Sequence, residues 1–233
     1  MLTLHIFGPA LGLPDPSPFA IKAMMLLKLA GLDYSTRCAD VRKAPKAKLP
    51  VLDDSGVLVP DSTFIRLHLE RTRGIDFDAG YDARERATAW SVEKMLEDHV
   101  YWLLVHDRWL DDTNFRRGPA TFFKTVPAPL RPFVIAAIRR QVRRNLWGQG
   151  IGRHNASERA LLAERAIDTA ANILGDRQFL LGDRPCGADA TFYAFVAVAL
   201  APGFEGAIHE AVMLHSNLIA YRDRMSTTYF PDL

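Results

Sequence analysis

The segment 48–70 constrains the fold of this chain more than any other, because its order of turn and cap signals leaves few alternatives. It reads KLPVLDDSGVLVPDSTFIRLHLE, with two short apolar runs on either side of the turn signal Asp54-Ser55-Gly56. Two such runs joined by a Gly-containing turn are typical of a β-hairpin. Pro60 ends the second run, and Asp61-Ser62 supplies an N-cap for the apolar-periodic stretch that follows. The segment therefore predicts a hairpin followed directly by a helix.

The residues before this segment predict a strand, a helix and a second strand. Residues 2–7 alternate between apolar and polar side chains, as a half-buried strand does. Ser17-Pro18 joins a preferred N-cap residue to the residue favoured at the first helical position, and Gly31 ends the apolar helix that follows. Residues 33–40 form a candidate second strand. The N-terminal part is therefore expected to be βαβ followed by ββα.

Every element expected after residue 81 is a helix. Apolar periodicity predicts helices at 82–110, 132–146, 155–174, 189–200 and 209–225, with an irregular connection that contains four prolines at 119–132. A variant capping box, Asn155-Ala156-Ser157-Glu158, marks one of the helix starts. The predicted fold class is α/β followed by all-α, with an α/β domain at 1–74, a linker at 75–83 and an all-helical domain at 84–233.

Composition argues against several classes of protein. The net charge of the 233-residue chain is +2, without the strongly basic balance of a dedicated nucleic-acid binder. No apolar run reaches the length of about 18 residues that predicts a membrane span, and the first residues lack the features of a signal peptide. Cys38 and Cys186 are the only cysteines and form no CxxC pair. We therefore expect a cytoplasmic protein with neither a nucleic-acid partner nor a membrane partner.

The order of elements and four local motifs resemble the glutathione transferase superfamily. Ser17-Pro18-Phe19 begins the first helix, where serine- and cysteine-type members keep the residue that activates glutathione. Leu49-Pro50 is similar to the element in which a residue precedes a cis-proline. Asp61-Ser62 is similar to the acidic–Ser pair that holds the γ-glutamyl end of glutathione. Residues 182–189, GDRPCGAD, are similar to the capping motif of the core helix in the second domain, which implies that Asp189 is a buried capping carboxylate.

Within the superfamily, the chain most resembles the metaxin and failed-axon-connections (Fax-like) group. The stretches that carry this likeness are EDHVYW at 97–102, RWL at 108–110 and GQGIGRH at 148–154. The resemblance implies an N-terminal thioredoxin-like domain, a C-terminal helical bundle and a homodimer. Phe7 stands where tyrosine-type members have their activating Tyr, and Ala20 replaces the second Cys of a redox CxxC, so neither of those mechanisms is expected.

Ser17 is the expected catalytic residue, with glutathione as co-substrate. A free thiol has a pKa of about 8.5, and lowering it by two units takes roughly 2.7 kcal/mol. A hydrogen bond to a charged acceptor contributes about 1.5–3 kcal/mol, so one hydroxyl at a helix start is sufficient in magnitude to hold a thiolate. The alternative is that Ser17-Pro18 is simply a favourable helix start, and the two roles are compatible.

The resemblance implies four further residues that bind glutathione. Leu49 would offer its backbone N–H and C=O to the cysteinyl part, beside a cis Pro50. Ser62 would bind the γ-glutamyl carboxylate at a helix N-terminus, which favours anions, and Asp61 would pair with the α-amino group. A plain N-cap is the alternative for both. The cation for the glycyl carboxylate stays open among Arg42, Lys43, Lys46 and Lys48.

The second substrate is expected to lie against the long helix. Tyr101, His106 and Arg108 are the candidate substrate-binding residues, and Tyr101 and Arg108, seven residues apart, can share one helix face. An aromatic and basic face suits an amphipathic electrophile. The neighbouring Trp102 and Trp109 are expected to be part of the core.

Two features outside this site have plain structural interpretations. His99 and His106 are seven residues apart, but no Cys or carboxylate completes a convincing set of ligands, so no metal site is predicted. Arg139-Arg140 and Arg143-Arg144 form a basic helix face, which suits an acidic partner or subunit but is more often solvated.

The sequence thus favours a glutathione transferase that conjugates glutathione to small apolar electrophiles, with Ser17 stabilising the thiolate. The alternative is a non-catalytic protein of the same fold, similar to metaxins, that binds a protein partner or a ligand. A carrier that binds glutathione without conjugating it would differ from the transferase only in turnover.

Overall fold

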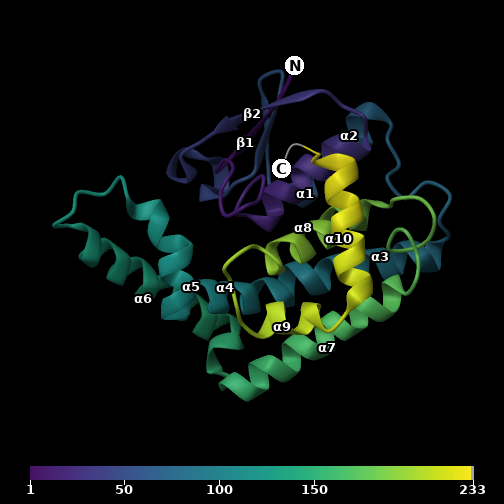
Figure 1. The fold of residues 1–233 in the computed structure, drawn as a ribbon. Coiled ribbons are helices and arrows are strands. Elements are labelled where there is room, and N and C mark those ends of the chain that lie inside the picture. Colours follow the sequence, from purple (N-terminus) through teal and green to yellow (C-terminus); the bar gives the residue numbers. More distant parts are fainter. Residues whose placement is uncertain (232–233) are drawn as a thin grey trace.

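A four-stranded mixed β-sheet forms the centre of the N-terminal domain in the computed structural model, which describes residues 1–231 (Figure 1). The strands are β1 (Leu2–Ile6), β2 (Tyr34–Cys38), β3 (Val51–Asp54) and β4 (Val57–Pro60), in the order β2-β1-β3-β4. β2 runs parallel to β1, whereas β3 is antiparallel to both of its neighbours. Helices α1 (Pro18–Leu29) and α2 (Ser62–Arg73) pack on the sheet and on each other. This is the predicted βαβ-ββα arrangement, a thioredoxin-like domain.

The strands of the sheet and the turn at Gly56 lie at the positions that the sequence pattern predicted. Leu2, Leu4 and Ile6 alternate into the core along β1. Gly56 takes a φ of 95° in the turn between β3 and β4, a conformation that glycine adopts readily. The peptide bond Leu49–Pro50, just before β3, is cis, as the resemblance predicted.

One long helix follows the N-terminal domain, as predicted for 82–110. It consists of α3 (Ala83–Met95), a π-helical turn (Leu96–Val100) and α4 (Tyr101–Leu110). Asp82 begins it with a capping box, its carboxylate accepting a hydrogen bond from the backbone N–H of Glu85 at 2.8 Å. The sequence pattern did not predict the π turn. Turns of this kind inside α-helices are frequent at functional sites.

The rest of the chain is helical and surrounds one buried helix. The remaining helices are α5 (Asp112–Arg117), α6 (Arg131–Gln149), α7 (Ala156–Leu174), α8 (Gly187–Ala199), α9 (Ala207–Met213) and α10 (Ser216–Tyr229). α8 is buried over its whole length and packs against α1 and α3, so it joins the two domains. Asp189 accepts hydrogen bonds from the backbone N–H groups of Cys186 (2.8 Å) and Leu180 (2.9 Å), which caps α8 as the resemblance implied.

The prediction of a single helix at 209–225 is wrong, because α9 and α10 are separate. His215 between them is extended, with φ −118° and ψ 97°, and its Nε2 lies 2.7 Å from Asp168 Oδ1 on α7. α10 then packs along α8, where the Tyr221 hydroxyl donates to Asp189 Oδ1 at 2.8 Å. These contacts between distant segments outweigh the continuous local periodicity.

Residues 112–149 project from the helical domain as an arm, at the left of Figure 1. The arm consists of α5, a short 3₁₀ segment (Pro119–Phe123), an irregular connection and α6. Of the nineteen residues of α6, Leu146 is the one that is buried. No helix within residues 1–231 combines the length and the apolar character that crossing a membrane requires.

Candidate functional site

Two cavities meet where the N-terminal domain faces the long helix. The first, of about 530 Å³, lies between the starts of α1 and α2 on one side and the long helix on the other. The second, of about 560 Å³, lies between the loop after β1 and α4. Both volumes are typical of small-molecule sites. Phe7, Ser17 and Tyr101 line both cavities and so mark their junction.

Ser17 stands at this junction because it is the N-cap of α1. Its hydroxyl makes no capping hydrogen bond to the helix, whose first residue, Pro18, has no N–H to satisfy. The half-buried hydroxyl is therefore left for an acceptor in the cavity. The positive end of the α1 dipole lies behind it and favours a negative charge at this point.

Asp15 holds the backbone of Ser17 in place. Its buried carboxylate accepts hydrogen bonds from the backbone N–H groups of Ser17 (2.8 Å), Phe7 (2.8 Å) and Gly8 (2.9 Å). Burial raises the pKa of Asp15 to about 6, although the three N–H donors act to lower it. Sequence reasoning missed this residue, for which the available signal was a lone carboxylate between prolines in the loop after β1.

The start of α2 forms a second polar corner of the first cavity. Asp61 is the N-cap and accepts a hydrogen bond from the backbone N–H of Thr63 at 2.9 Å. Its φ of 83° is uncommon for a residue with a side chain. Strained backbone of this kind costs of order 1–3 kcal/mol and gathers at ligand sites. Ser62, which is 2% exposed, lines the cavity beside it, so an N-cap role and a cavity role coexist here.

The loop before the cis peptide bond closes a third side of the cavity. Leu49 lines it, with Pro50 directly behind at the start of β3. Among the described residues that were candidates for the glycyl carboxylate, Lys48 is the one that lines the cavity. Arg42 is directed elsewhere, since its guanidinium lies 2.8 Å from the carboxylate of Asp40.

The long helix forms the opposite wall around its π turn. Trp90, Lys94, Glu97 and Asp98 face the cavity there. Lys94 Nζ lies 2.6 Å from Glu97 Oε2 and 4.4 Å from the centre of the Trp90 ring. Asp98 is exposed and provides a second carboxylate, besides Asp61, for a positively charged group of a ligand.

A buried ionic network lies behind this wall. Lys22 of α1, which is 0% exposed, contacts Glu93 at 3.0 Å and Glu97 at 2.6 Å. Arg66 of α2 contacts Glu93 at 3.3 Å and Asp78 at 2.5 Å. Although burial acts to raise it, the pKa of Glu93 lies below its usual value because three cationic side chains stand beside it. The network fixes α1 and α2 to the long helix on either side of the cavity.

The second cavity is mostly apolar. Leu104, Val105 and Trp109 of α4 line it. Trp109 and Trp102, which we expected in the core, are both half-buried and line the second and first cavity, respectively.

Tyr101 provides the polar group at the boundary between the two cavities. Its ring packs edge-on against Phe19, with the ring centres 4.9 Å apart. Burial raises the pKa of Tyr101, so the phenol keeps its proton at neutral pH. Tyr101 is thus able to donate a hydrogen bond to a ligand beside Ser17.

Of the three residues predicted to bind the second substrate, Tyr101 and Arg108 line the second cavity, whereas His106 lines neither of the two cavities. Five residues beyond Tyr101, a helical side chain points about 140° away around the axis, so His106 does not share the helix face of Tyr101. Arg108 donates to the backbone carbonyls of Pro16 (3.0 Å) and Val198 (2.9 Å), which ties the loop after β1 to the end of α8. Burial lowers the pKa of Arg108 to about 10.

The arrangement can hold two different small molecules side by side. The first cavity offers carboxylates, two lysines and two helix starts to a charged polar ligand, and the second offers apolar walls. Ser17 and Tyr101 are hydroxyl donors at the boundary. Across residues 1–231, no three His, Cys, Asp or Glu side chains are grouped so as to bind a metal ion.

Two family models match the chain. The model described as the glutathione S-transferase N-terminal domain matches residues 18–114, and the one described as the glutathione S-transferase C-terminal domain matches residues 163–225. The first match begins at Pro18, directly after Ser17, and contains the start of α2 and all of the long helix. The second contains α8 and most of α7 and α10.

Three curated relatives align with essentially the whole chain. Isoprene-epoxide–glutathione S-transferase of Rhodococcus sp. (strain AD45) is 27% identical, over 98% of this chain and 99% of its own length. Metaxin-1 of Mus musculus is 26% identical, over 99% of this chain and 75% of its own length. Failed axon connections of Drosophila melanogaster is 25% identical over 100% of this chain, which spans 59% of that protein. The predicted likeness to the metaxin and Fax-like group is therefore confirmed.

A solved structure shows the same fold. The beta-etherase LigF from Sphingobium sp. strain SYK-6 aligns with a TM-score of 0.66 and 18% identity, over 100% of this chain and 99% of that one. The alignment spans both domains of this chain.

Proposed function

Because the chain belongs to the glutathione S-transferase superfamily, we propose that it is a transferase that conjugates glutathione to small apolar electrophiles. The observation that carries this proposal is the junction at Ser17 and Tyr101, where a cavity with charged walls adjoins an apolar one. A conjugating enzyme has to hold a zwitterionic tripeptide and an apolar partner with their reacting atoms in contact, and this junction is where they would meet.

The first cavity offers a partner for each charged end of glutathione. Ser62 and the N-terminus of α2 would bind the γ-glutamyl carboxylate, and Asp61, with Asp98 across the cavity, would accept from the α-amino group. Lys48 would meet the glycyl carboxylate, and the backbone of Leu49 would hold the cysteinyl residue. In this orientation the thiol lies at the Ser17 hydroxyl.

The electrophile that we propose is a small epoxide, the substrate type in the name of the Rhodococcus relative. The thiol gives its proton to solvent, and the Ser17 hydroxyl donates a hydrogen bond to the thiolate. Sulfur then attacks a ring carbon, so that an S–C bond forms while the C–O bond breaks with its electron pair moving to oxygen. Tyr101 donates a hydrogen bond to that oxygen, which finally takes a proton from water.

The oligomeric state and the location of the protein complete the proposal. Cys38 and Cys186 are free thiols, which supports a reducing, cytoplasmic setting. The homodimer implied by the resemblance stays a prediction, which light scattering of the purified protein would measure.

A non-catalytic protein of this fold is the second candidate, favoured by the curated relatives named metaxin-1 and Failed axon connections. Such a protein would share the fold of the transferase but would not bind glutathione and react it with an electrophile. A non-catalytic member need not keep the charged groups of the first cavity in working order, so glutathione binding separates the two candidates at the first step.

The first experiment is calorimetric titration of the purified protein with reduced glutathione, and an assay of conjugation to an epoxide then separates the transferase from a carrier that only binds glutathione. We expect binding in the micromolar to low-millimolar range, weakened by Ser62→Ala through loss of a charge-assisted hydrogen bond, about 1.5–3 kcal/mol. Ser157→Ala, an exposed serine on α7, is the matched control and should bind as the parent does. No heat and no thermal stabilisation at several millimolar glutathione would reject the transferase and favour the non-catalytic candidate.

A further inference from the structure

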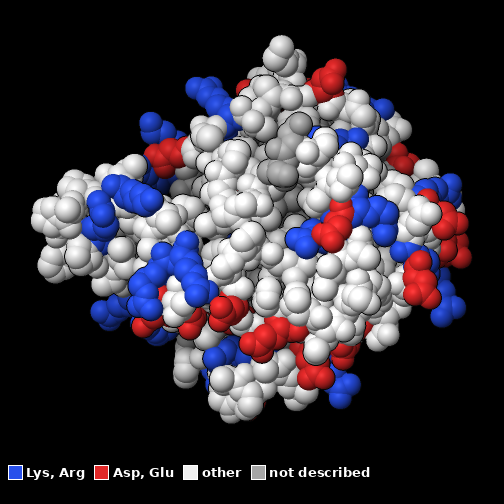
Figure 2. All heavy atoms as spheres, viewed as in Figure 1, with Lys and Arg blue, Asp and Glu red and all other residues white. Residues whose placement is uncertain are grey.

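The arm, residues 112–149, lies in the most basic part of the sequence. Residues 113–157 contain nine Lys and Arg side chains and no Asp or Glu, although the net charge of the whole chain is +2. The remainder of the chain is therefore acidic on balance. A charge asymmetry of this kind points to an anionic partner for the basic segment. In the view of Figure 2 the outer part of the arm, at the left, carries blue and white side chains.

The exposed face of α6 combines aromatic and cationic side chains in one stripe. Phe133, Arg140, Arg144 and Trp147 are all exposed, and at 3.6 residues per turn they lie within about 60° of one another around the helix axis. We call these four residues the aromatic–arginine stripe. It runs for about 21 Å along the helix. Phe133 is 75% exposed and Trp147 is 59% exposed, so both large aromatic side chains face solvent.

The connection before α6 adds further apolar surface to the end of the arm. Leu130 is 56% exposed and directly precedes the helix. The residues just before it, Val126 to Pro129, include two prolines and no charged side chain. Exposed apolar groups at one place on a soluble protein mark a surface that binds something.

The charge pattern decides among possible occupants. A twofold contact between two copies of α6 would bring two sets of arginines together, since such an interface uses the same patch on both subunits. Nucleic acid would suit the arginines but leaves the proline- and leucine-containing end without a role. An interfacial helix on a lipid surface uses both, because its aromatic and leucine side chains enter the headgroup boundary while its basic side chains meet lipid phosphates.

We propose that the aromatic–arginine stripe, with Leu130, docks the protein on a membrane surface that contains anionic lipids. The contact is peripheral, and it revises the expectation of no membrane partner, which rested on the lack of a spanning segment. Phe122 of the arm lines the second cavity, so the arm that carries the stripe also forms part of the wall of that cavity. The proposal stands whether or not the protein is catalytic.

Co-sedimentation with lipid vesicles tests the proposal directly. The full chain is mixed with vesicles of phosphatidylcholine alone, or of phosphatidylcholine with about 30% phosphatidylserine, a content that gives the surface a negative potential. We expect sedimentation with the anionic vesicles and little with the neutral ones, decreasing as salt is added because surface charges are screened.

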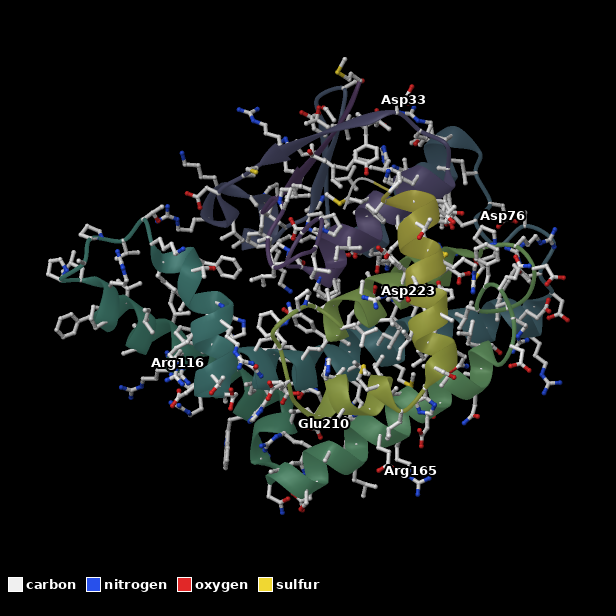
Figure 3. The ribbon with its side chains drawn as sticks, in the orientation of Figure 1. Asp33, Asp76, Arg116, Arg165, Glu210 and Asp223 are labelled. Carbon is white, nitrogen blue, oxygen red and sulfur yellow. The ribbon has the colours of Figure 1, made fainter. Side chains whose placement is uncertain are left out.

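Two double variants assign the binding to the stripe. Arg140→Gln with Arg144→Gln should weaken binding about fivefold for each charge removed, and Phe133→Ser with Trp147→Ser about tenfold for each side chain. The matched controls are Arg84→Gln with Arg165→Gln, two exposed arginines outside the arm, of which Arg165 is labelled on α7 in Figure 3. For the apolar pair the control is Leu161→Ser with Leu214→Ser, which are 53% and 75% exposed. Both control pairs should bind as the parent does.

Four results would overturn the proposal. They are an absence of sedimentation with both kinds of vesicle, an equal loss in the stripe variants and their controls, a change of oligomeric state in the stripe variants by light scattering, and tighter binding to a single-stranded oligonucleotide than to the vesicles. The third result would make the stripe a subunit interface, and the fourth would make it a nucleic-acid site. Circular dichroism of each variant shows that it is folded.

Discussion

Lys22 Nζ lies 2.6 Å from Glu97 Oε1, a contact that joins α1 to the π turn of the long helix across the boundary of the two domains. Glu97 also lines the first cavity, so one carboxylate belongs both to the buried network and to the cavity wall. Its other oxygen is held by Lys94 at 2.6 Å. The position of the π turn, and with it the shape of the cavity, therefore depends on a lysine that ligands do not reach.

Replacement of Lys22 by Met is expected to destabilise the protein strongly. Methionine fills a similar volume but removes one of the two lysines that Glu93 and Glu97 share, so the buried network keeps its carboxylates with one cation fewer. Removing one partner of a buried ion pair costs about 3–5 kcal/mol. Urea denaturation followed by circular dichroism measures the loss.

The control for this prediction is Lys43→Met, because Lys43 is exposed. Its replacement should change the free energy of unfolding by no more than about 0.5 kcal/mol. Adding Glu97→Gln to Lys22→Met should recover part of the stability, because it removes one negative charge from a network that has lost a cation. A Lys22→Met protein as stable as the control would show that the network does not hold the domains together.

The elements of this fold that could be predicted from the sequence are those whose turn or cap residues lie within a few positions of the element. The hairpin around Gly56, the helix begun by Ser17 and the helix begun by Asp82 each depend on a turn or cap that is local in sequence. The cis state of Pro50 came from the family resemblance. The break at His215 depends on Asp168 of α7, which no local pattern contains.

The residues of the candidate site also fall into two groups, those that the sequence predicted and those that it did not. Ser17 and Ser62, which line the first cavity, were predicted from local helix-start signals together with the family resemblance. Asp15 and Lys22 were missed because their roles come from partners brought together by folding. A lysine in the apolar stretch of α1 was the available signal for Lys22, since a charged side chain in a buried helix needs a partner.

Ser17→Ala is expected to reduce turnover at neutral pH without preventing glutathione binding. Losing a hydrogen bond to the thiolate, about 1.5–3 kcal/mol, raises the pKa of bound glutathione by roughly one to two units. The rate should then fall roughly 10- to 100-fold below the pKa of the parent complex. At a pH above the pKa of the free thiol, about 8.5, the difference in rate between the parent and Ser17→Ala should become smaller.

A pH–rate profile measures this effect and separates it from a loss of structure, which would lower the rate equally at all pH values. Calorimetry with glutathione should give nearly the same affinity for both proteins. An unchanged profile in Ser17→Ala would remove Ser17 from the catalytic role and leave it as a helix start.

Asp15 is expected to make stability depend on pH between about 4 and 6. Its pKa is raised in the folded protein from 3.8 to about 6 by burial, so the folded state keeps a proton that the unfolded state has lost. The parent should therefore be most stable, relative to Asp15→Asn, below pH 4. That advantage should decline by up to about 3 kcal/mol as the pH rises to 6.

Denaturation curves at several pH values, with the variant subtracted from the parent, isolate this contribution. Asp33→Asn is the control, because Asp33 is exposed on the far side of the N-terminal domain (Figure 3) and accepts no backbone hydrogen bonds from the cavity loop. A parent-minus-variant difference that is flat from pH 4 to 6 would contradict the raised pKa.

Tyr101→Phe is expected to slow conjugation of an epoxide while sparing a substrate that leaves no oxyanion. The phenol keeps its proton because burial raises its pKa, and it stands at the junction of the two cavities, where the departing oxygen would lie. Removing one donor to a developing oxyanion lowers kcat by about 10²- to 10³-fold in other enzymes, and the KM for glutathione should stay unchanged.

An alkyl halide is the matched control substrate, because its leaving group is a halide that needs no proton. Parent and variant should therefore conjugate it at similar rates. Equal losses with both substrates would make Tyr101 a packing residue against Phe19, and no loss with either would move the oxyanion elsewhere in the cavity.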